Sequence, residues 1–445
     1  MKFQTLLLTI FGVAAVVSVV VFANTKSKNQ AVESGGNVAI WGTFQHTKDL
    51  ADLITDFNRE HRDQFTISYE FHDAKNFDSD IVEALSSQKG PDVLLLPDDL
   101  VLRHFDKVEL IPYTMFPPAT FSSLFVQSAE IYLRDGGLEA LPFAIDPMVM
   151  YWNRDLFNNA SITAPPKYWD EFLEMTPKLT RRNNKTSELL QSALPFGEFT
   201  NVNNAKDLIA MLFLQVGNPI VKIEKNVPVA KVTSLDGSRI VPDESVVSAF
   251  RFFMDFSNPL KSNFTWSLAR GNSLNEFIDG NLAVHFDYAS AYNVITKKNP
   301  HLNFAVAPMP QPRNTSAEIT FGRMHGLAVL KTSKNKQTAF LAIQRLLLDP
   351  LPAKRFAAAF SLPPVRRDLL ADKPTNPEMS IFYDSAIRAR TWLDPKPQAS
   401  DKAFRDMVEL VSSGRSDAPA AVSKLNGQLE VILKSYKSDA ILPTN

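Results

Sequence analysis

The chain of 445 residues contains no cysteine and only seven histidines. The first absence excludes disulfide bonds, thiolate metal ligands, cysteine nucleophiles and a lipid attached to an N-terminal cysteine. The histidines are scattered and show no paired spacing of the kind that zinc sites use. Serine-hydrolase signatures, phosphate loops and dinucleotide-binding glycine turns are missing as well. We therefore expect no catalytic residues, no cofactor and no metal, and we do not expect an enzyme.

Charge of one sign is not in excess either, because the sequence contains 47 Lys and Arg and 48 Asp and Glu. The formal net charge of −1 argues against nucleic acid as a partner, since nucleic-acid-binding surfaces are strongly basic. With 45% hydrophobic and 21% charged residues, the composition is that of a globular protein long enough for two or three domains. No heptad pattern requires a partner chain, so we expect a monomer.

The longest apolar run lies near the N-terminus, at residues 6–23. Its length approaches the roughly 20 residues of a membrane-spanning helix and exceeds the apolar core of a secretory signal. We expect residues 1–23 to be an uncleaved signal-anchor; a signal peptide cleaved after Val21-Phe22-Ala23 is the alternative. Residues 24–36 are polar and predict a flexible tether. The remainder should then lie on the extracytoplasmic face of the cell membrane.

Apolar and polar residues alternate in the first hundred residues as they do in an α/β fold. Strand patterns at 38–40, 67–71 and 93–96 are separated by helical patterns after Thr47 and at 77–87. This order predicts a parallel sheet with helical crossovers. Ligands bind such sheets at the carboxyl ends of the strands, which here are residues 41–45, 72–73 and 97–99. The chain after residue 332 is expected to be mostly helical.

One segment is more informative than the rest. Residues 139–157 read EALPFAIDPMVMYWNRDLF and are followed by Pro165-Pro166 and by Trp169-Asp170-Glu171-Phe172. Further motifs occur in order along the chain: Trp41-Gly42-Thr43-Phe44, Lys89-Gly90-Pro91-Asp92-Val93, FIDGNLAV at 277–284, Ala307-Pro308-Met309-Pro310, Ser333-Lys334-Asn335-Lys336 and SLPPVRRD at 361–368. Together they resemble the bacterial extracellular solute-binding proteins of the maltose-binding kind, which are receptors of ABC importers.

The resemblance implies a periplasmic-binding-protein type II fold, with two discontinuous α/β lobes, three crossovers and a ligand cleft between the lobes. It places the crossovers near residues 143–146, 286–290 and 331–334. The first lobe would comprise residues 37–143 plus 290–332. The second would comprise residues 144–289 plus 333–445. The chain departs from the common family pattern in lacking the cysteine that carries the lipid anchor.

Several charged residues are candidates for the ligand site. Carboxylates accept hydrogen bonds from sugar hydroxyls, and the resemblance implies such contacts for Asp99 and Asp146, from opposite sides of one cleft. From the residues alone, each could equally cap a helix or a turn. Arg323 and His325 interrupt a strand-like stretch between two glycines, and the alternative for them is the solvent-facing side of that strand. Asp92, by contrast, is expected to be a structural turn residue.

Aromatic side chains complete the expected site, because a flat ring stacks on the apolar face of a pyranose while the hydroxyls stay free. Trp41 and Phe44 follow the first predicted strand. The resemblance implies cleft positions for Tyr288 and Trp392. About half of the aromatic candidates should prove to be packing residues. Trp169 is expected in the core.

The function that these features predict is that of an ABC-importer substrate-binding protein. It would capture a small solute, most readily an uncharged sugar or oligosaccharide, between its lobes and deliver it to an ABC permease in the membrane. One alternative is a receptor for a non-sugar solute, such as a peptide, a polyamine or a metal ion. The other is a membrane-anchored surface protein without a transport role.

Overall fold

The computed structural model describes residues 36–439, except residues 46, 226, 237, 238, 314 and 316. The expected signal-anchor and all but the last residue of the expected tether lie outside the described residues. Among the helices of the described part, none has both the length and the apolar character that crossing a membrane requires. The anchor and the tether therefore stay predictions.

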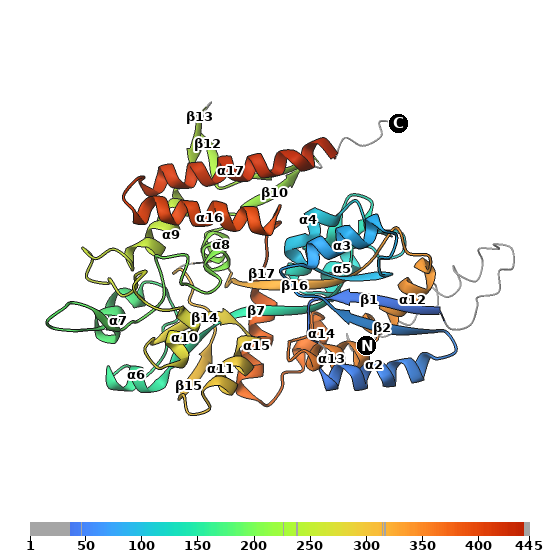
Figure 1. Cartoon of the computed structure of the whole chain (residues 1–445), viewed down its shortest axis with the longest axis horizontal. Coiled ribbons are helices and arrows are strands. Elements are labelled where there is room, and N and C mark those ends of the chain that lie inside the picture. The colour runs from blue at the N-terminus through green and yellow to red at the C-terminus, as the bar shows by residue number, and fades with distance from the viewer. Residues whose placement is uncertain are drawn as a thin grey trace, which may run out of the picture.

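One sheet of eight strands runs through the molecule, as Figure 1 shows. The order is β14-β7-β16-β3-β1-β2, with β15 paired to β7 and β17 paired to β16. The bounds are β1 (Gly36–Gly42), β2 (Phe65–Phe71), β3 (Val93–Pro97), β7 (Leu141–Asn153), β14 (Val284–Tyr288), β15 (Phe304–Ala307), β16 (Thr320–Val329) and β17 (Ala389–Arg390). This sheet and the helices beside it confirm the predicted α/β class.

Strands β1, β2 and β3 form the parallel part of the sheet, as the sequence pattern predicts. Helix α2 (Lys48–His61) and helix α3 (Phe77–Ser86) connect them. Thr47 starts α2 by accepting a hydrogen bond from the Leu50 backbone N–H at 3.2 Å. Leu50 and Phe57 bury the apolar face of α2. The 3-10 helix η1 (Asp98–Leu100) follows directly at the carboxyl end of β3.

Strand β7 joins the two halves of the molecule. Its 13 residues are buried almost throughout. Residues 141–147 pair with β16, whereas residues 148–153 pair with β14 and β15, all antiparallel. The register sets Asp146 opposite Arg323 and Met148 opposite Tyr288. One strand therefore brings three of the expected site residues close together where the two halves join.

Two hydrophobic cores lie along this sheet, and we call the segments that build them the first and the second lobe. The chain passes from the first core to the second between residues 145 and 148. It returns between residues 321 and 324 and leaves again between residues 389 and 392. Three crossovers are therefore present, and the first lies within two residues of its expected place.

The other two expected crossovers are wrong. Residues 286–290 stay in the second lobe because β14 pairs with the second half of β7. Residues 331–334 precede α12 (Lys336–Leu347), which packs beside β1 and β16 in the first lobe. The lobe boundaries shift accordingly: residues 291–309 belong to the second core and residues 339–370 to the first. The motifs determine the order of the segments along the chain. They do not determine which of the two cores the helix after each motif covers.

The remaining helices cover the two cores. Apolar residues at helical spacing predict helices at residues 168–179, 203–216 and 244–256 and through most of the chain after residue 332. The structure has helices in these places, namely α7 (Glu171–Leu179), α8 (Ala205–Gln215), α9 (Glu244–Asp255), α12, α15 (Pro377–Arg388), α16 (Pro397–Ser412) and α17 (Ala418–Asp439). Shorter helices are α4 (Val101–His104), α5 (Pro118–Leu124), η2 (Gln127–Tyr132), α6 (Arg154–Asn159), α10 (Ser273–Ile278), α11 (Ala291–Lys298), α13 (Pro350–Ala359) and α14 (Arg367–Ala371).

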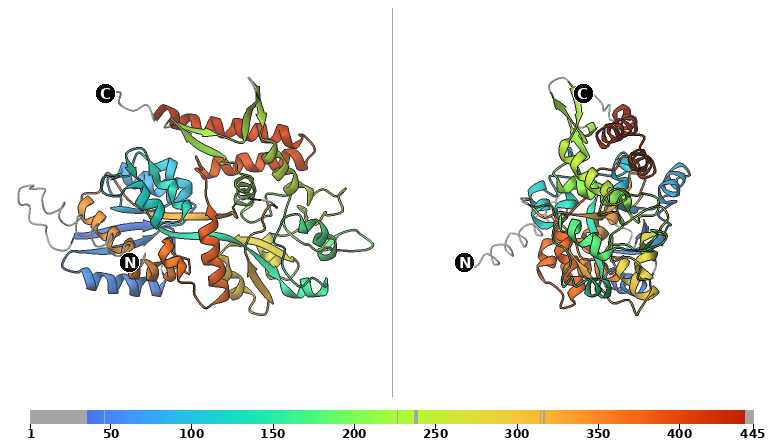
Figure 2. Two further views of the ribbon diagram at one scale, coloured as in Figure 1. Left: turned by 180° about the vertical axis from the view of Figure 1, so that it is seen from behind. Right: turned by 90° about the vertical axis from the view of Figure 1, so that its left-hand side faces the viewer.

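Short antiparallel strand pairs lie outside the large sheet in both lobes, and the sequence analysis did not predict them. Three of these pairs belong to the second lobe. They are β8 (Arg181–Arg182) with β9 (Leu189–Gln191), β10 (Val221–Glu224) with β11 (Val227–Ala230), and β12 (Thr233–Asp236) with β13 (Arg239–Pro242). In the first lobe, β6 (Gly137–Leu138) pairs with β4 (Ile111–Pro112) and β5 (Leu133–Arg134). Figure 2 shows α16 and α17 side by side along one face of the second lobe, next to the β12–β13 hairpin.

Candidate functional site

A polar cavity lies where the two lobes and the third crossover meet. Its lining residues are Asp98 and Asp99 of η1, Lys206 and Asp207 of α8, Phe321 and Arg323 of β16, and Trp392 and Asp394 after β17. The free volume is about 20 Å³, roughly the space of one water molecule. Its position beyond the carboxyl end of β3 is where open α/β sheets bind ligands.

Asp207 is the centre of the hydrogen bonding on the second-lobe side. Its Oδ2 accepts hydrogen bonds from the Tyr288 hydroxyl at 2.6 Å and from Arg323 Nη2 at 3.0 Å. The Arg323 guanidinium also lies over the Tyr288 ring, 4.5 Å from its centre. Burial opposes the ionisation of Asp207, but the positive charges of Arg323 and Lys206 outweigh it and lower the pKa of this carboxyl. Asp207 is therefore a carboxylate that holds Arg323 at the cavity.

A second ion pair closes the cavity from the side of the third crossover. Lys206 Nζ lies 2.7 Å from Asp394 Oδ2, and the Ser400 hydroxyl donates to the same oxygen at 2.7 Å. Burial would lower the pKa of Lys206, yet the neighbouring carboxylates of Asp394 and Asp207 raise it. Lys206 therefore keeps its positive charge although it is largely buried.

Asp98 and Asp99 enter the cavity from the first lobe. Burial raises the pKa of Asp98 well above its ordinary value, and the nearby charge of Asp99 raises it further. The Thr391 hydroxyl donates a hydrogen bond to Asp98. Burial also raises the pKa of Asp99, against the opposing charges of Lys206 and Arg323. Within the described residues, no protein group donates a hydrogen bond to the Asp99 side chain, so its oxygens are open acceptors in the cavity.

A larger cavity adjoins the polar one and shares Trp392 with it. Its volume is about 400 Å³, within the range of small-molecule sites. The first lobe contributes residues 127–134 of η2 and β5, the second lobe residues 214–223 around the end of α8, and the crossover residues 390–393. We call this space the interlobe pocket. It offers room for a ligand that reaches the polar cavity at one end.

Four of the residues predicted for the site lie together here. Asp99, Arg323 and Trp392 line the polar cavity, and Tyr288 lies directly behind Arg323. Asp146 lies beside the cavity without lining it, and it accepts a hydrogen bond from the Ser290 backbone N–H at 3.1 Å. Burial raises the pKa of Asp146 to about 6, an effect that the bond from Ser290 partly opposes.

The other three predicted site residues lie on the first lobe and line neither cavity. Trp41 packs against His72, with ring centres 4.1 Å apart. Phe44 packs against His325 at 4.6 Å and against Phe360 at 4.5 Å, so both of its neighbours are other rings. Burial and the charge of Arg323 lower the pKa of His325 to about 3, so this imidazole is neutral near pH 7. These side chains act as packing in the present arrangement.

Sequence reasoning missed Lys206 and Asp207. The signal was available, because the two charges stand next to each other at the start of a helix whose remaining residues are almost all apolar. Charged side chains that are nearly buried call for specific partners. The partners come from β14, β16 and the third crossover, and no local pattern brings those segments to α8.

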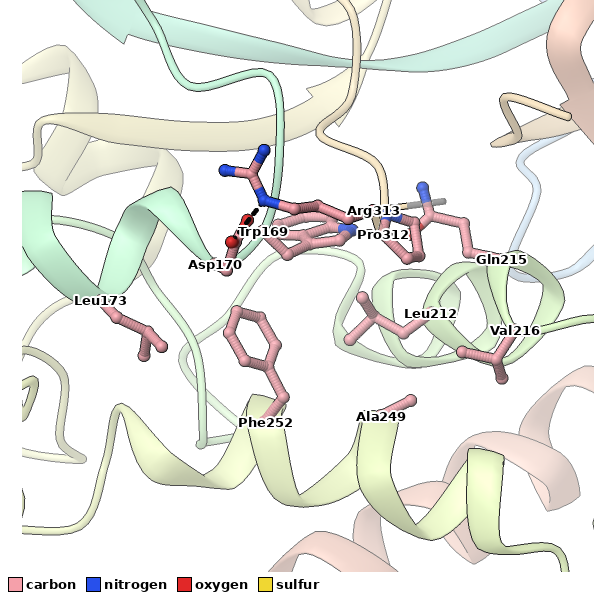
Figure 3. Close-up of a pocket in the computed structure, with 10 residues that line it drawn as sticks. All are labelled: Trp169, Asp170, Leu173, Leu212, Gln215, Val216, Ala249, Phe252, Pro312 and Arg313. Carbon is pink, nitrogen blue, oxygen red and sulfur yellow. Dashed lines mark hydrogen bonds and ion pairs between the residues drawn. The ribbon is translucent and has the colours of Figure 1, made fainter. Parts of the chain in front are cut away.

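A further pocket of about 310 Å³ lies within the second lobe and shares no lining residue with the two cavities (Figure 3). Its walls are mainly apolar side chains from α7, α8 and α9. The dashed line in Figure 3 marks the bond from Arg313 Nε to Asp170 Oδ2, which is 2.6 Å long and lies beside Trp169. Trp169 itself is only 6% exposed, so the expectation that it belongs to the core is confirmed.

Glu139 gives a test of the electrostatics near the interlobe pocket. It is buried beside Arg134, with 2.7 Å between Glu139 Oε1 and Arg134 Nε. Burial raises the pKa of Glu139 from 4.5 to about 7, against the positive charge of Arg134. The folded protein therefore holds this proton more tightly than the unfolded chain does. Its stabilising contribution is full below pH 4.5 and is lost as the pH rises through about 7.

We expect the free energy of unfolding to fall by about 2 kcal/mol more in the wild type than in Glu139→Gln between about pH 5 and about pH 8. Urea denaturation at several pH values measures both slopes. The glutamine variant serves as the matched control, because it keeps the shape and removes the titration. Equal slopes for the two proteins would contradict the assignment.

Comparison with known proteins decides the family. Residues 52–380 match the profile described as bacterial extracellular solute-binding protein. The chain belongs to this family. A Brucella abortus (strain 2308) protein named as a binding protein is 24% identical over 315 residues, which cover 69% of this chain and 69% of the relative. A Deinococcus radiodurans protein named as an ABC transporter-binding protein is 24% identical over 304 residues, 66% of this chain and 69% of the relative.

The chain has the type II periplasmic-binding-protein fold, which it shares with the solved structures of similar fold. The GacH receptor of Streptomyces glaucescens GLA.O, studied with acarbose, has a TM-score of 0.68 at 20% identity and covers 91% of this chain and 99% of its own. The cyclic alpha-maltosyl-1,6-maltose binding protein of Arthrobacter globiformis has a TM-score of 0.73 at 15% identity, with 90% and 99% covered. The family and the fold are those of binding proteins.

Proposed function

We propose that this chain is the substrate-binding protein of an ABC importer and that it captures a sugar or oligosaccharide between its two lobes. The observation that carries the proposal is a polar cavity and an adjoining 400 Å³ pocket, both built from the two lobes together. Acceptor carboxylates, a guanidinium and an indole ring meet there, and saccharides are bound by this set of groups. The Deinococcus relative named for ABC transport supports it, and so do the GacH receptor in complex with acarbose and the neighbour named as a cyclic alpha-maltosyl-1,6-maltose binding protein.

The saccharide would lie in the interlobe pocket and reach the polar cavity beside Trp392. Its hydroxyls would donate to Asp99 and accept from Arg323. Because Asp99 belongs to the first lobe and Arg323 to the crossover strand β16, one ligand engages both sides. Such a ligand shifts the protein toward the closed state by its better contacts there. In this role the protein would work on the extracytoplasmic side and deliver the solute to a permease in the membrane. The predicted N-terminal anchor would tether the protein to that membrane.

Asp99→Ala tests the proposal directly. We expect the affinity for the bound saccharide to fall about ten- to a hundred-fold, since each charge-assisted hydrogen bond contributes about 1.5–3 kcal/mol. Stability without ligand should change by less than about 1 kcal/mol, because the Asp99 side chain accepts no bond from the described protein. Calorimetric titration and melting curves over a broad panel of mono- and oligosaccharides measure both quantities.

Asp92→Ala is the matched control. Asp92 accepts hydrogen bonds from the Ala39 backbone N–H at 3.0 Å and from the Ser333 hydroxyl at 2.6 Å, away from both cavities. Its loss should reduce stability and leave saccharide affinity unchanged. If no saccharide of the panel binds to the wild type, or if Asp99→Ala binds as tightly as the wild type, the proposed site fails.

A further inference from the structure

The interlobe pocket carries an excess of positive charge. Its ionisable lining residues are Glu130, Arg134, Lys222 and Arg390. Glu130 and Lys222 are exposed, whereas the two arginines are partly buried. Arg134 has a carboxylate partner in Glu139. In the part of the chain that the structure describes, no carboxylate lies within ion-pair distance of Lys222 or Arg390. Neither cation therefore has a carboxylate in direct contact, although Glu130 acts on Arg390 from a greater distance.

Hydrogen-bond donors in the same pocket also lack partners. Ser128 is 3% exposed, and its hydroxyl has no partner among the described residues. Arg134 uses Nη1 to donate to the carbonyl groups of Ile131 and Leu133, at 3.0 and 2.8 Å. Its Nη2 is buried and has no partner among the described residues either. Buried donors without acceptors are unfavourable, so an acceptor oxygen of a ligand that reaches this wall of the pocket would be stabilised by them.

Arg390 lies at the wall of the pocket. It belongs to β17, which pairs with β16, and its Nη1 donates to the Ala389 carbonyl at 2.8 Å. Burial and the neighbouring charge of Arg367 lower the pKa of Arg390, with Glu130 acting in the opposite direction. A second positive charge close to a half-buried arginine repels it. An anion in the pocket would relieve this repulsion and would match the planar fork of the guanidinium.

We propose that the interlobe pocket recognises an anionic group of the saccharide, a carboxylate or a phosphate ester, through Arg390, Arg134 and Ser128. The proposal rests on the proposed saccharide-binding function and specifies its substrate class as acidic saccharides. It departs from the uncharged carbohydrate that the sequence led us to expect. The ligand would lie with its anionic group at Arg390 and its hydroxyls at Asp99, because the positive residues line the pocket and four carboxylates line the polar cavity.

The experiment compares matched ligands on the full-length protein by calorimetric titration. The carboxylate arm uses trigalacturonate and the same trisaccharide after reduction of its carboxyl groups. The phosphate arm uses trehalose 6-phosphate and trehalose, with inorganic phosphate alone to reveal simple anion binding. The variants are Arg390→Gln and, as a control, Arg388→Gln. The control removes the same charge two residues earlier in the chain, where Arg388 pairs with Glu318 outside the pocket.

We expect the anionic member of at least one pair to bind more than about ten-fold tighter than its neutral counterpart. Arg390→Gln should abolish this preference, and Arg388→Gln should leave it intact. Higher ionic strength should reduce the preference in the wild type. The ligand pair that shows the preference, carboxylate or phosphate, identifies the anionic group that the pocket recognises.

Two results would overturn the inference and leave the proposed function standing. One is equal binding of the neutral and anionic members. The other is a preference that survives Arg390→Gln while an intact melting curve shows that the variant is folded. Binding of inorganic phosphate without any saccharide would overturn the inference and the saccharide function together. Failure of every saccharide, charged or neutral, would overturn the proposed function itself.

Discussion

Replacing Trp169 by alanine should lower the free energy of unfolding by about 3–5 kcal/mol, the usual range for truncating a buried tryptophan. The side chain packs against four phenylalanine rings of the second lobe, with centre distances between 5.6 and 6.0 Å, namely Phe172, Phe196, Phe252 and Phe286. Its Nε1–H donates to Gln215 Oε1 at 2.7 Å. The pocket of Figure 3 borders the ring, so truncation would enlarge an existing hollow.

Trp169→Phe separates the two contributions of this residue. It keeps most of the ring packing but leaves the Gln215 amide oxygen without its donor, so we expect a smaller loss of about 1–3 kcal/mol. Urea denaturation measures both variants. Saccharide affinity should be unchanged in the folded fraction, because Trp169 lines neither interlobe cavity. A loss below about 1 kcal/mol in Trp169→Ala would contradict a core role.

The parallel half of the sheet was predictable because its evidence is local. Alternation at Val38 and Ile40, a capping Thr47 and a continuous apolar run from Val93 each specify one element within a few residues. The same holds for the helices of the second lobe, whose apolar spacing repeats every turn. The hairpins between residues 221 and 242 were not predicted, because short antiparallel strand pairs lack a long periodic pattern in the sequence. Their packing against α17 supplies the stabilisation that their own sequence does not show.

The crossovers were harder to predict, because an apolar strand has the same sequence pattern in either lobe. Only pairing decides that β14 stays with the second half of β7 and that β16 returns to the first half. The same limit applies to the site. Asp99 and Trp392 were found through family resemblance, and Arg323 was found because it interrupts a strand-like stretch. Lys206 and Asp207, by contrast, gain their role from partners more than 80 residues away in sequence. Trp41 and Phe44 lie at a strand end, as expected, yet both side chains pack against neighbouring aromatic rings.

The polar cavity makes Asp207 the residue whose loss should affect both stability and binding. Asp207→Ala would leave the buried Tyr288 hydroxyl without its acceptor and would remove the partner of Arg323. An unpaired buried hydroxyl is unfavourable by about 1–3 kcal/mol. The Arg323 contribution is smaller, because this side chain is 48% exposed and water can replace the carboxylate. We therefore expect unfolding to become easier by about 2–3 kcal/mol in total.

Saccharide affinity should fall by about ten-fold or more in the same variant, because a freed Arg323 no longer presents its guanidinium toward Asp99 in one orientation. Asp207→Asn is the informative control, since its amide oxygen still accepts from Tyr288 but no longer neutralises Arg323. That variant should regain most of the stability and little of the affinity. Urea denaturation and calorimetric titration of both variants test this. If Asp207→Ala keeps wild-type affinity, Arg323 does not depend on Asp207 for its place in the site. If Asp207→Asn regains affinity and stability together, the carboxylate charge has no separate role there.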